Sequence, residues 1–391
     1  MQKKLWSKEF TAIASSNLLM AWAFYALMPT LPIYLTRDLK VSHGHTGLVM
    51  AAFSISAILI RPFAGYLIDN YHRFLVFILS LSLVTVVYGI YPLVNGVAAM
   101  FLLRLIHGAT WGICSSSTAP LVADAVPADR LGEGIGIYAM SIPVGMTIGP
   151  MFGFEILKGH GSDMMFLSVL GISFLSLLIA FFAKTPFKAI IRKKFFLINL
   201  FHRRALPLSL CMFFIMIAYG AIIVFVGVHA AQKGFSNVGT FFLCFAATLF
   251  LSRVFLSKLF DKGYIFQLIL VGVALVAVGM PWLGYAWNPT QFLVAGMING
   301  FGFGILMPTC QAAINNLVDS RERGAANSTY LVSYDLGMGA GSLLVGFLSD
   351  KIGLGEIYGY ITFLIMLSAA IFVFKAIPHY HRNRLKDSAG R

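Results

Sequence analysis

A charged turn separates two long apolar runs near residue 70. The stretch Arg61–Arg73 reads RPFAGYLIDNYHR. An apolar run ends at Asp69, the polar residues Asn70 and His72 follow, and a second apolar run begins after Arg73. An apolar run of about 20 residues is long enough to cross the hydrocarbon core of a bilayer as a helix. The stretch therefore predicts two membrane-spanning helices joined by a short polar loop.

The composition of the whole chain agrees with this local pattern. Of its 391 residues, 59% are hydrophobic and only 11% are charged, and the mean hydropathy is +0.83. Soluble domains carry about 25% charged residues, so a water-soluble protein is excluded. The apolar runs are too long for barrel strands and lack their alternation. We expect an all-α membrane protein with twelve transmembrane helices near residues 10–35, 46–68, 74–93, 97–122, 132–157, 164–183, 207–232, 236–257, 264–284, 290–318, 324–348 and 355–376.

Basic residues indicate the orientation and the division of the chain. The net charge is +14, and most Lys and Arg residues fall in loops on one side of the predicted membrane. This asymmetry predicts that both termini are cytoplasmic, and it argues against a nucleic-acid partner because the basic residues form no continuous patch. The longest hydrophilic connection separates six spans from six. The expected parts are an N-terminal bundle, a basic cytoplasmic linker, a C-terminal bundle and a cytoplasmic tail, at residues 1–183, 184–206, 207–378 and 379–391.

An internal repeat relates the two bundles. Shifting the chain on itself by 192 residues aligns Gly108 with Gly300, Gly149 with Gly341, and the stretch that begins at Arg61 with the one that begins at Arg253. Because six helices separate the copies, both enter the membrane in the same sense. This predicts bundles related by a pseudo-two-fold axis along the membrane normal, with a substrate site at their seam.

The turn after the second span matches a known pattern. The sequence from Gly65 to Arg73 reads G-x-L-x-D-x-x-x-R and closely resembles the signature of the major facilitator superfamily, with a degenerate second copy from Ser257 to Asp261. The resemblance implies that Asp69 faces the start of the eleventh helix at Gly324 and Ala325, and that Arg73 pairs with Asp124. Such contacts would latch the cytoplasmic side during transport; the alternative is a topology signal with incidental ion pairing. The gating candidates in and around this signature are Gly65, Asp69, Arg73, Asp124, Arg61 and Asp261.

Two further segments narrow the resemblance to the twelve-helix drug:proton antiporters. Residues 103–109, LRLIHGA, are similar to the motif with a membrane-embedded arginine in that family, and residues 145–153, GMTIGPMFG, are similar to its antiporter motif G-x-x-x-G-P-x-x-G. Glycines four residues apart let another helix approach closely, and proline can bend a span; simple helix packing is the alternative. The second motif contributes the conformational candidates Gly145, Gly149, Pro150 and Gly153.

Four ionisable residues are candidates for proton coupling. Arg104 lies about seven residues into the fourth span, roughly 10 Å below the outer surface, where a charge is costly. His107 shares its helix face and could either titrate or pack as a neutral ring. Asp335 lies near the bilayer centre and could carry a proton or pair with Arg61. Glu155 lies close to the outer interface, and no acidic residue occupies residues 10–35, where some family members carry one.

The cavity predicted from the resemblance is mostly aromatic. The first, fourth, seventh and tenth spans line it in the superfamily, and in this chain they offer Asn17, Tyr25, Trp111, Tyr219, Asn299 and Phe303. Few polar anchors among aromatic side chains suit lipophilic or amphipathic molecules, although such residues also face lipid. The four cysteines show no metal-ligand spacing, and no Walker loop, HExxH or G-x-S-x-G triad is present, so we expect no metal, no cofactor and no enzymatic activity.

These observations together predict a secondary active transporter that works by alternating access in a bacterial inner membrane. The resemblance favours proton-coupled efflux of small lipophilic or amphipathic compounds. The alternatives are a metabolite facilitator or importer on the same fold and a lipid or glycolipid flippase. We expect a small-molecule substrate, protons and membrane lipids as partners, and a monomer as the oligomeric state.

Overall fold

The computed structural model describes residues 5–127, 130–184, 202–261, 263–319 and 322–384. Most of the predicted linker at residues 184–206 lies outside these ranges. The side chains of residues 254–258, 260–261 and 324 are also outside the description, so the predicted side-chain role of Asp261 stays a prediction. Contacts between residues divide the chain into two compact units, residues 1–195 and 196–391, which are described separately below as unit 1 and unit 2.

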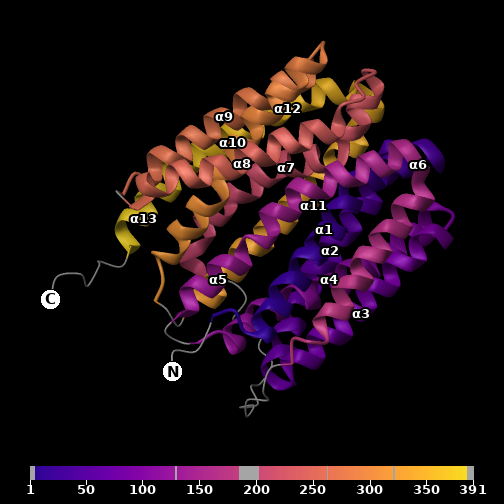
Figure 1. Cartoon of the computed structure of the whole chain (residues 1–391). Helices are drawn as coiled ribbons and strands as arrows, with labels where there is room; N and C mark the ends of the chain where they lie inside the picture. Colours follow the sequence, from indigo (N-terminus) through magenta and orange to yellow (C-terminus); the bar gives the residue numbers. More distant parts are fainter. Residues whose placement is uncertain (1–4, 128–129, 185–201, 262, 320–321, 385–391) are drawn as a thin grey trace. The chain divides into compact units, whose positions relative to one another are not determined.

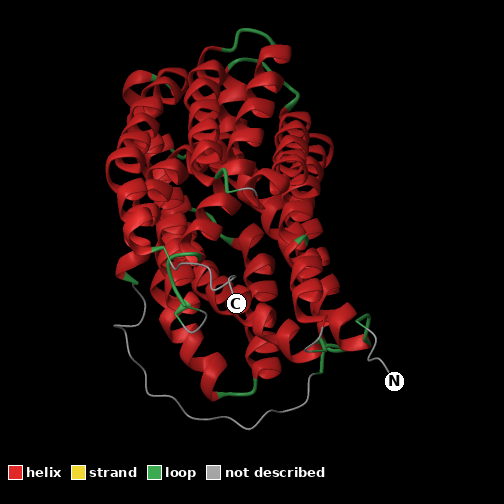
Figure 2. Ribbon diagram, turned by 90° about the vertical axis from the view of Figure 1, so that its left-hand side faces the viewer, coloured by secondary structure: helices red, strands yellow, loops and turns green. Residues whose placement is uncertain are grey.

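Unit 1 is built from helices joined by short turns (Figures 1 and 2). Its α-helices are α1 (Lys8–Ile33), α2 (His43–Asn70), α3 (Arg73–Ile90), α4 (Val97–Ala125), α5 (Leu131–Ala139) and α6 (Ser141–Ala180). A π-helical turn, η1 (Tyr34–Asp38), extends α1, and a 3-10 turn, η2 (Tyr91–Leu93), follows α3. Within this unit α1 packs mainly on α6, and α4 packs on α2 and α3.

Unit 2 repeats the pattern. Its α-helices are α7 (Leu206–Gln232), α8 (Val238–Asp261), α9 (Ile265–Tyr285), α10 (Pro289–Asn315), α11 (Arg323–Ile352), α12 (Leu354–Ile371) and α13 (Ile377–Asn383). A 3-10 turn, η5 (Arg203–Ala205), precedes α7, and a π-helical turn, η6 (Phe372–Ala376), links α12 to α13. Helical structure therefore continues to Asn383, past the expected end of the bundle at residue 378. Here α7 packs on α11, and α10 packs on α8 and α9.

The helices account for the predicted spans. Among the described residues, ten helical segments are long and apolar enough to cross a bilayer, and α8 adds a shorter apolar segment, Val238–Arg253. One of the ten, Leu131–Ala180, covers two predicted spans, because Gly161 adopts a non-helical conformation (φ 82°, ψ −177°) inside α6 and separates two helices there. In unit 2, Gly353 between α11 and α12 has a similar φ of 78° and ends one span before the next begins.

Close glycine contacts occur at equivalent positions in the two units. A Cβ added at Gly108 in α4 would lie 2.9 Å from the carbonyl carbon of Phe53 in α2, and a Cβ added at Gly300 in α10 would lie 2.8 Å from that of Phe245 in α8. The two contacts are 192 residues apart at both ends, which is the shift found in the sequence. The repeat therefore preserves backbone-to-backbone packing as well as residue identity.

Candidate functional site

A buried cation lies near the start of α4 in unit 1. Arg104, on the second turn of α4, has no exposed surface. Its Nη1 donates to the hydroxyl of Tyr91 at 3.5 Å, its Nη2 approaches the Sδ of Met28 at 3.2 Å, and its Cζ lies 4.5 Å from the ring centre of Phe53. A guanidinium over an aromatic face gains a cation–π attraction, which strengthens when water is excluded. Helices α1, α2 and α4 and the turn η2 thus all contribute to holding this charge.

His107 lies in the same cluster, one turn further along α4. Its ring is fully buried, and its Nδ1 shares a 2.9 Å hydrogen bond with the hydroxyl of Tyr91, so Tyr91 joins the imidazole to Arg104. The rings of Tyr88 and Phe53 meet the imidazole edge-to-face at 4.9 and 5.1 Å. The three-residue spacing on one helix face, which was read from the sequence, brings the two ionisable groups into one network.

The cluster is short of hydrogen-bond partners. The Nε of Arg104, the Nε2 of His107 and the hydroxyl of Tyr88 are all buried without a partner, and no carboxylate pairs with Arg104 among the described residues. A buried charge with no counter-charge is expensive, and buried polar atoms left unpaired are uncommon in folded proteins. Such a costly arrangement is typical of a site kept for function.

The corresponding place in unit 2 carries no charge. The same shift of 192 residues aligns Arg104 with Gly296 and His107 with Asn299. Asn299 is fully buried, its amide donates to the carbonyl of Ala295 at 2.9 Å, and it packs so closely on α9 that a Cβ at Gly279 would lie 2.6 Å from it. Asn299 therefore serves α9–α10 packing within unit 2. Among the described residues, the cluster of unit 1 therefore has no ionisable counterpart at the aligned position of unit 2.

The signature turn has the local geometry that its sequence predicts. Asp69 lies in the last turn of α2, only Tyr71 and His72 separate α2 from α3, and Arg73 begins α3. The Nη1 of Arg73 lies 2.9 Å from Oδ2 of Asp124, near the end of α4, and the Asp124 side chain is 7% exposed. The pairing implied by the resemblance is present, and it ties the α2–α3 turn to α4. The contact expected between Asp69 and the start of α11 joins the two units and stays a prediction.

The antiporter-like glycines line the contact between α6 and α1. A Cβ at Gly145 would lie 2.7 Å from Cβ of Ala21, and a Cβ at Gly149 would lie 2.8 Å from Cβ of Tyr25. Gly153 continues the series one turn further on, where an added Cβ would lie 3.1 Å from the side chain of Thr30. Pro150 lies inside this part of α6. The motif thus brings two helices into backbone contact along three successive turns.

The remaining ionisable candidates are spread through the fold. Glu155 is exposed in α6, as its predicted place near the interface would require. Asp335 lies within α11 and is 9% exposed, and Arg61 lies within α2 and is half-buried. The structure therefore brings Arg104 and His107 together in unit 1, whereas Glu155 lies apart from them.

The predicted cavity residues lie among aromatic neighbours within each unit. Trp111 stacks on Phe24 with ring centres 4.0 Å apart, and Tyr219 meets Phe303 edge-to-face at 5.3 Å. Asn17 is buried and its amide nitrogen has no hydrogen-bond partner. Of the six candidates, only Tyr25 and Trp111 are more than slightly exposed, each at an intermediate level.

Sequence reasoning missed the neighbours that define the cluster. Tyr88 and Tyr91 come from the end of α3 and from η2, while Phe53 and Met28 come from α2 and α1. The signal available was Tyr88 and Tyr91 three residues apart at the outer end of the third span, followed by Pro92, which ends the helix. Periodicity alone cannot show which of many aromatic side chains meet a given cation.

Comparisons with known proteins agree with this architecture. The family model described as Major Facilitator Superfamily matches residues 13–290 and 268–390. The chain is 23% identical over 375 residues to a protein of Staphylococcus aureus named staphylopine export protein, covering 87% of this chain and 90% of that one. It is 26% identical over 353 residues to the multi-drug resistance efflux pump PmrA homolog of Lactococcus lactis, covering 84% and 87%. A 147-residue stretch is 30% identical to the quinolone resistance protein NorA of S. aureus, covering 37% and 38%.

Solved structures show the same fold at low sequence identity. The human organic anion transporter MFSD10 (TETRAN) aligns with a TM-score of 0.70 at 18% identity over 93% of this chain and 98% of that chain. A bacterial homolog of the human lysosomal transporter Spinster aligns with a TM-score of 0.76 at 14% identity, covering 97% and 98%. The predicted all-helical two-bundle fold is confirmed. With its family model matched along nearly its whole length, this chain belongs to the Major Facilitator Superfamily and is an integral membrane transporter.

Proposed function

We propose that this transporter is a proton-coupled exporter of small lipophilic or amphipathic compounds that works by alternating access. The observation that carries the proposal is the buried cluster of Arg104, Tyr91 and His107, which holds a cation and an ionisable ring without a carboxylate. Relatives named as export or efflux proteins support the direction of transport.

The cluster has the parts that a proton relay needs. The guanidinium of Arg104 stays protonated in proteins, so it serves as a fixed charge, whereas an imidazole can bind and release a proton. The hydroxyl of Tyr91 both accepts from Arg104 and shares a hydrogen bond with His107, so it can pass a change at one group to the other. Because His107 is fully buried, a proton can reach it only when a conformational change admits water.

Asp335 is the second coupling candidate. A carboxylate in the middle of a membrane-spanning helix is costly unless it is paired or protonated, so its protonation could also accompany the transport cycle. Glu155 is the weakest candidate because it is exposed and lies apart from the buried cluster of Arg104, Tyr91 and His107. Neutral substitutions of His107, Asp335 and Glu155, made one at a time, distinguish the contributions of these three residues to proton coupling.

Two further parts of unit 1 serve the conformational cycle in this proposal. The glycine contacts between α6 and α1 allow the two helices to shift along a smooth backbone surface. The turn that contains Gly65, Asp69 and Arg73 would act as the cytoplasmic latch, held on its own side by the ion pair with Asp124. The aromatic candidates in α1, α4, α7 and α10 would bind an apolar substrate face, with few polar anchors.

The direct test uses the full chain in inside-out proteoliposomes with ethidium as a fluorescent probe. A proton gradient that is acidic inside should drive ethidium accumulation, and collapse of the gradient should release it. The variant H107Q should lose gradient-driven accumulation but keep gradient-free exchange of ethidium across the membrane. Accumulation of ethidium by H107Q at the wild-type level, with the wild-type proton dependence, would exclude His107 as the coupling residue. The same experiment on D335N then tests the Asp335 carboxylate.

The same vesicles separate the alternatives. Solute movement in the direction of the proton gradient, rather than against it, would identify an importer, and gradient-independent equilibration would identify a facilitator. Translocation of headgroup-labelled lipid by the purified protein would identify a flippase. Any of these three results would overturn the proposed export function while leaving the fold and the family unchanged.

A further inference from the structure

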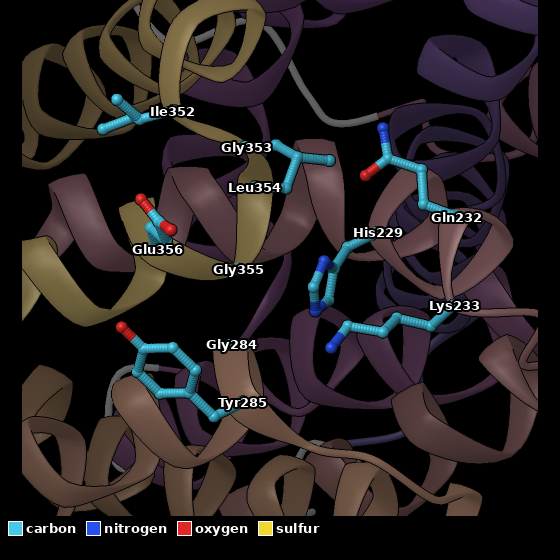
Figure 3. A pocket seen from close by; sticks show the side chains of 10 residues that line it. All are labelled: His229, Gln232, Lys233, Gly284, Tyr285, Ile352, Gly353, Leu354, Gly355 and Glu356. Atoms are coloured by element: carbon cyan, nitrogen blue, oxygen red, sulfur yellow. The ribbon is translucent and has the colours of Figure 1, made fainter.

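Unit 2 contains a pocket at the end where α7 and α9 finish and α12 begins (Figure 3), which the topology predicts to be its outer end. Its volume is about 330 Å³, within the range of small-molecule sites. The last turn of α7 contributes His229 and Lys233, α9 contributes Tyr285, and the start of α12 contributes Gly355 and Glu356. All of these residues belong to unit 2.

The pocket contains a buried polar group with an unmet hydrogen bond. His229 is only 2% exposed, and its Nε2 has no close hydrogen-bond partner among the described residues, although the backbone of Leu283 and Gly284 also interacts with its ring. Figure 3 shows its imidazole facing the open space next to the ammonium of Lys233, while Tyr285 and Glu356 lie on the opposite wall. No ion pair joins Lys233 to Glu356 among the described residues. Buried polar atoms without a close partner are uncommon in folded proteins, and a bound molecule is one of the arrangements that satisfies them.

The start of α12 adds further donors on the same wall. The cap residue of this 18-residue helix is Gly353, which has a φ of 78° and no side chain to cap the first turn. Unpaired backbone N–H groups at a helix start favour negative charge. Gly355, in that first turn, also lacks a side chain that would keep a ligand away from the backbone.

Unit 1 shows what fills the equivalent corner of its own fold. There the end of η1 meets α6 just after Gly161, and the corner is closed by Arg37, Asp38 and Ser162. Nε of Arg37 lies 2.6 Å from Oδ1 of Asp38, and the hydroxyl of Ser162 also contacts that carboxylate. In unit 2 the end of α7 carries basic residues but no acidic residue. Leu354 follows Gly353 there, where Ser162 follows Gly161 in unit 1. The second copy therefore lacks counterparts of the Asp38 carboxylate and the Ser162 hydroxyl, and the carboxylate that lines its pocket comes from Glu356 instead.

We infer that the pocket of unit 2 binds a small organic monocarboxylate, whose carboxylate takes the place that Asp38 holds in unit 1. The ammonium of Lys233 supplies the charge, the imidazole of His229 supplies a donor, and the first turn of α12 supplies backbone N–H groups. Glu356, on the far wall, repels a second negative charge, so dicarboxylates bind less well than monocarboxylates. This site is independent of the export function proposed above.

The test compares benzoate with its neutral isostere benzamide by titration calorimetry on the full chain in detergent. Benzoate should bind at least tenfold more tightly than benzamide, and phthalate should bind less tightly than benzoate. The variant K233Q should weaken benzoate binding about tenfold and leave benzamide unchanged. Lys233 is exposed, so this change should not disturb folding.

The matched control is K351Q, which removes an exposed lysine near the end of α11 that does not line the pocket. It should leave the affinity for benzoate unchanged. Equal weakening by K233Q and K351Q would show only a general attraction between benzoate and a basic protein, and would overturn the assignment. Equal affinity for benzoate and benzamide, or unaltered benzoate binding in K233Q, would overturn it as well. None of these results depends on transport by the protein.

Discussion

The contact of α6 with α1 gives a prediction whose size follows from the structure. In the variant Gly149→Ala, the new methyl group would lie 2.8 Å from Cβ of Tyr25 and 2.9 Å from the backbone nitrogen of Ala26, whereas ordinary contact begins near 3.4 Å. Backbone atoms cannot rotate away, so the two helices must separate by about half an ångström. Overpacking of this kind costs about 1–3 kcal/mol, more than the roughly 1 kcal/mol that alanine gains over glycine within a helix.

The net cost is then about 1 kcal/mol. For a folding unit of this size, each kcal/mol lowers the melting temperature by about 2–4 °C, so we expect a loss of roughly 3 °C in thermal unfolding of the detergent-purified protein. Gly341→Ala, the counterpart in unit 2, meets the backbone of Ile217 and should lose a similar amount. Gly171→Ala is the control within α6, since nothing lies within 4 Å of its added methyl group, and it should be neutral or slightly stabilising. A melting temperature for Gly149→Ala equal to that of Gly171→Ala would refute the close-contact reasoning.

Three further outcomes are expected. Asp124→Asn should break the 2.9 Å ion pair with Arg73. It should slow ethidium transport more than it lowers the melting temperature, because the Arg73 side chain is 35% exposed and can turn to water. A large drop in the melting temperature with normal transport would contradict the latch proposal. Glu155→Gln should leave the proton dependence of transport unchanged, since the carboxylate is exposed. Loss of the proton dependence in this variant would identify Glu155 as a coupling residue. Asp335→Asn should abolish proton-driven movement only if this residue carries the coupling proton, so surviving proton dependence would favour His107.

The sequence predicted the fold well because membrane helices leave strong signals. Apolar length, the distribution of basic residues and the 192-residue repeat are properties of whole segments and do not depend on any single contact. The repeat did not show which glycines lie in close contact, but the structure places Gly108 and Gly300, which the repeat aligns, against equivalent backbone positions. The division of residues 131–180 at Gly161 was also visible as a short polar stretch between two apolar runs.

The candidate site was predicted only in part. Arg104 and His107 could be identified because a charge deep in a span is rare, and their three-residue spacing placed them on one face. Tyr91 and Phe53 could not, because the aromatic residues of this chain are numerous and only tertiary packing decides which of them meets the cation. Asn299, in contrast, was proposed from the sequence because it lies on a span expected to line the cavity. In the structure it packs against Gly279 inside unit 2.

The absence of an ionisable pair at Gly296 and Asn299 has an evolutionary consequence. A duplicated gene begins with two identical halves, and each half is then free to lose groups that the other retains. If the ancestor of this chain carried a charge in both halves, one was discarded once a single charge sufficed; if it carried none, unit 1 acquired its cluster later. In both histories the two halves are no longer interchangeable, and a chain assembled from two copies of unit 2 would lack the cluster of Arg104, Tyr91 and His107.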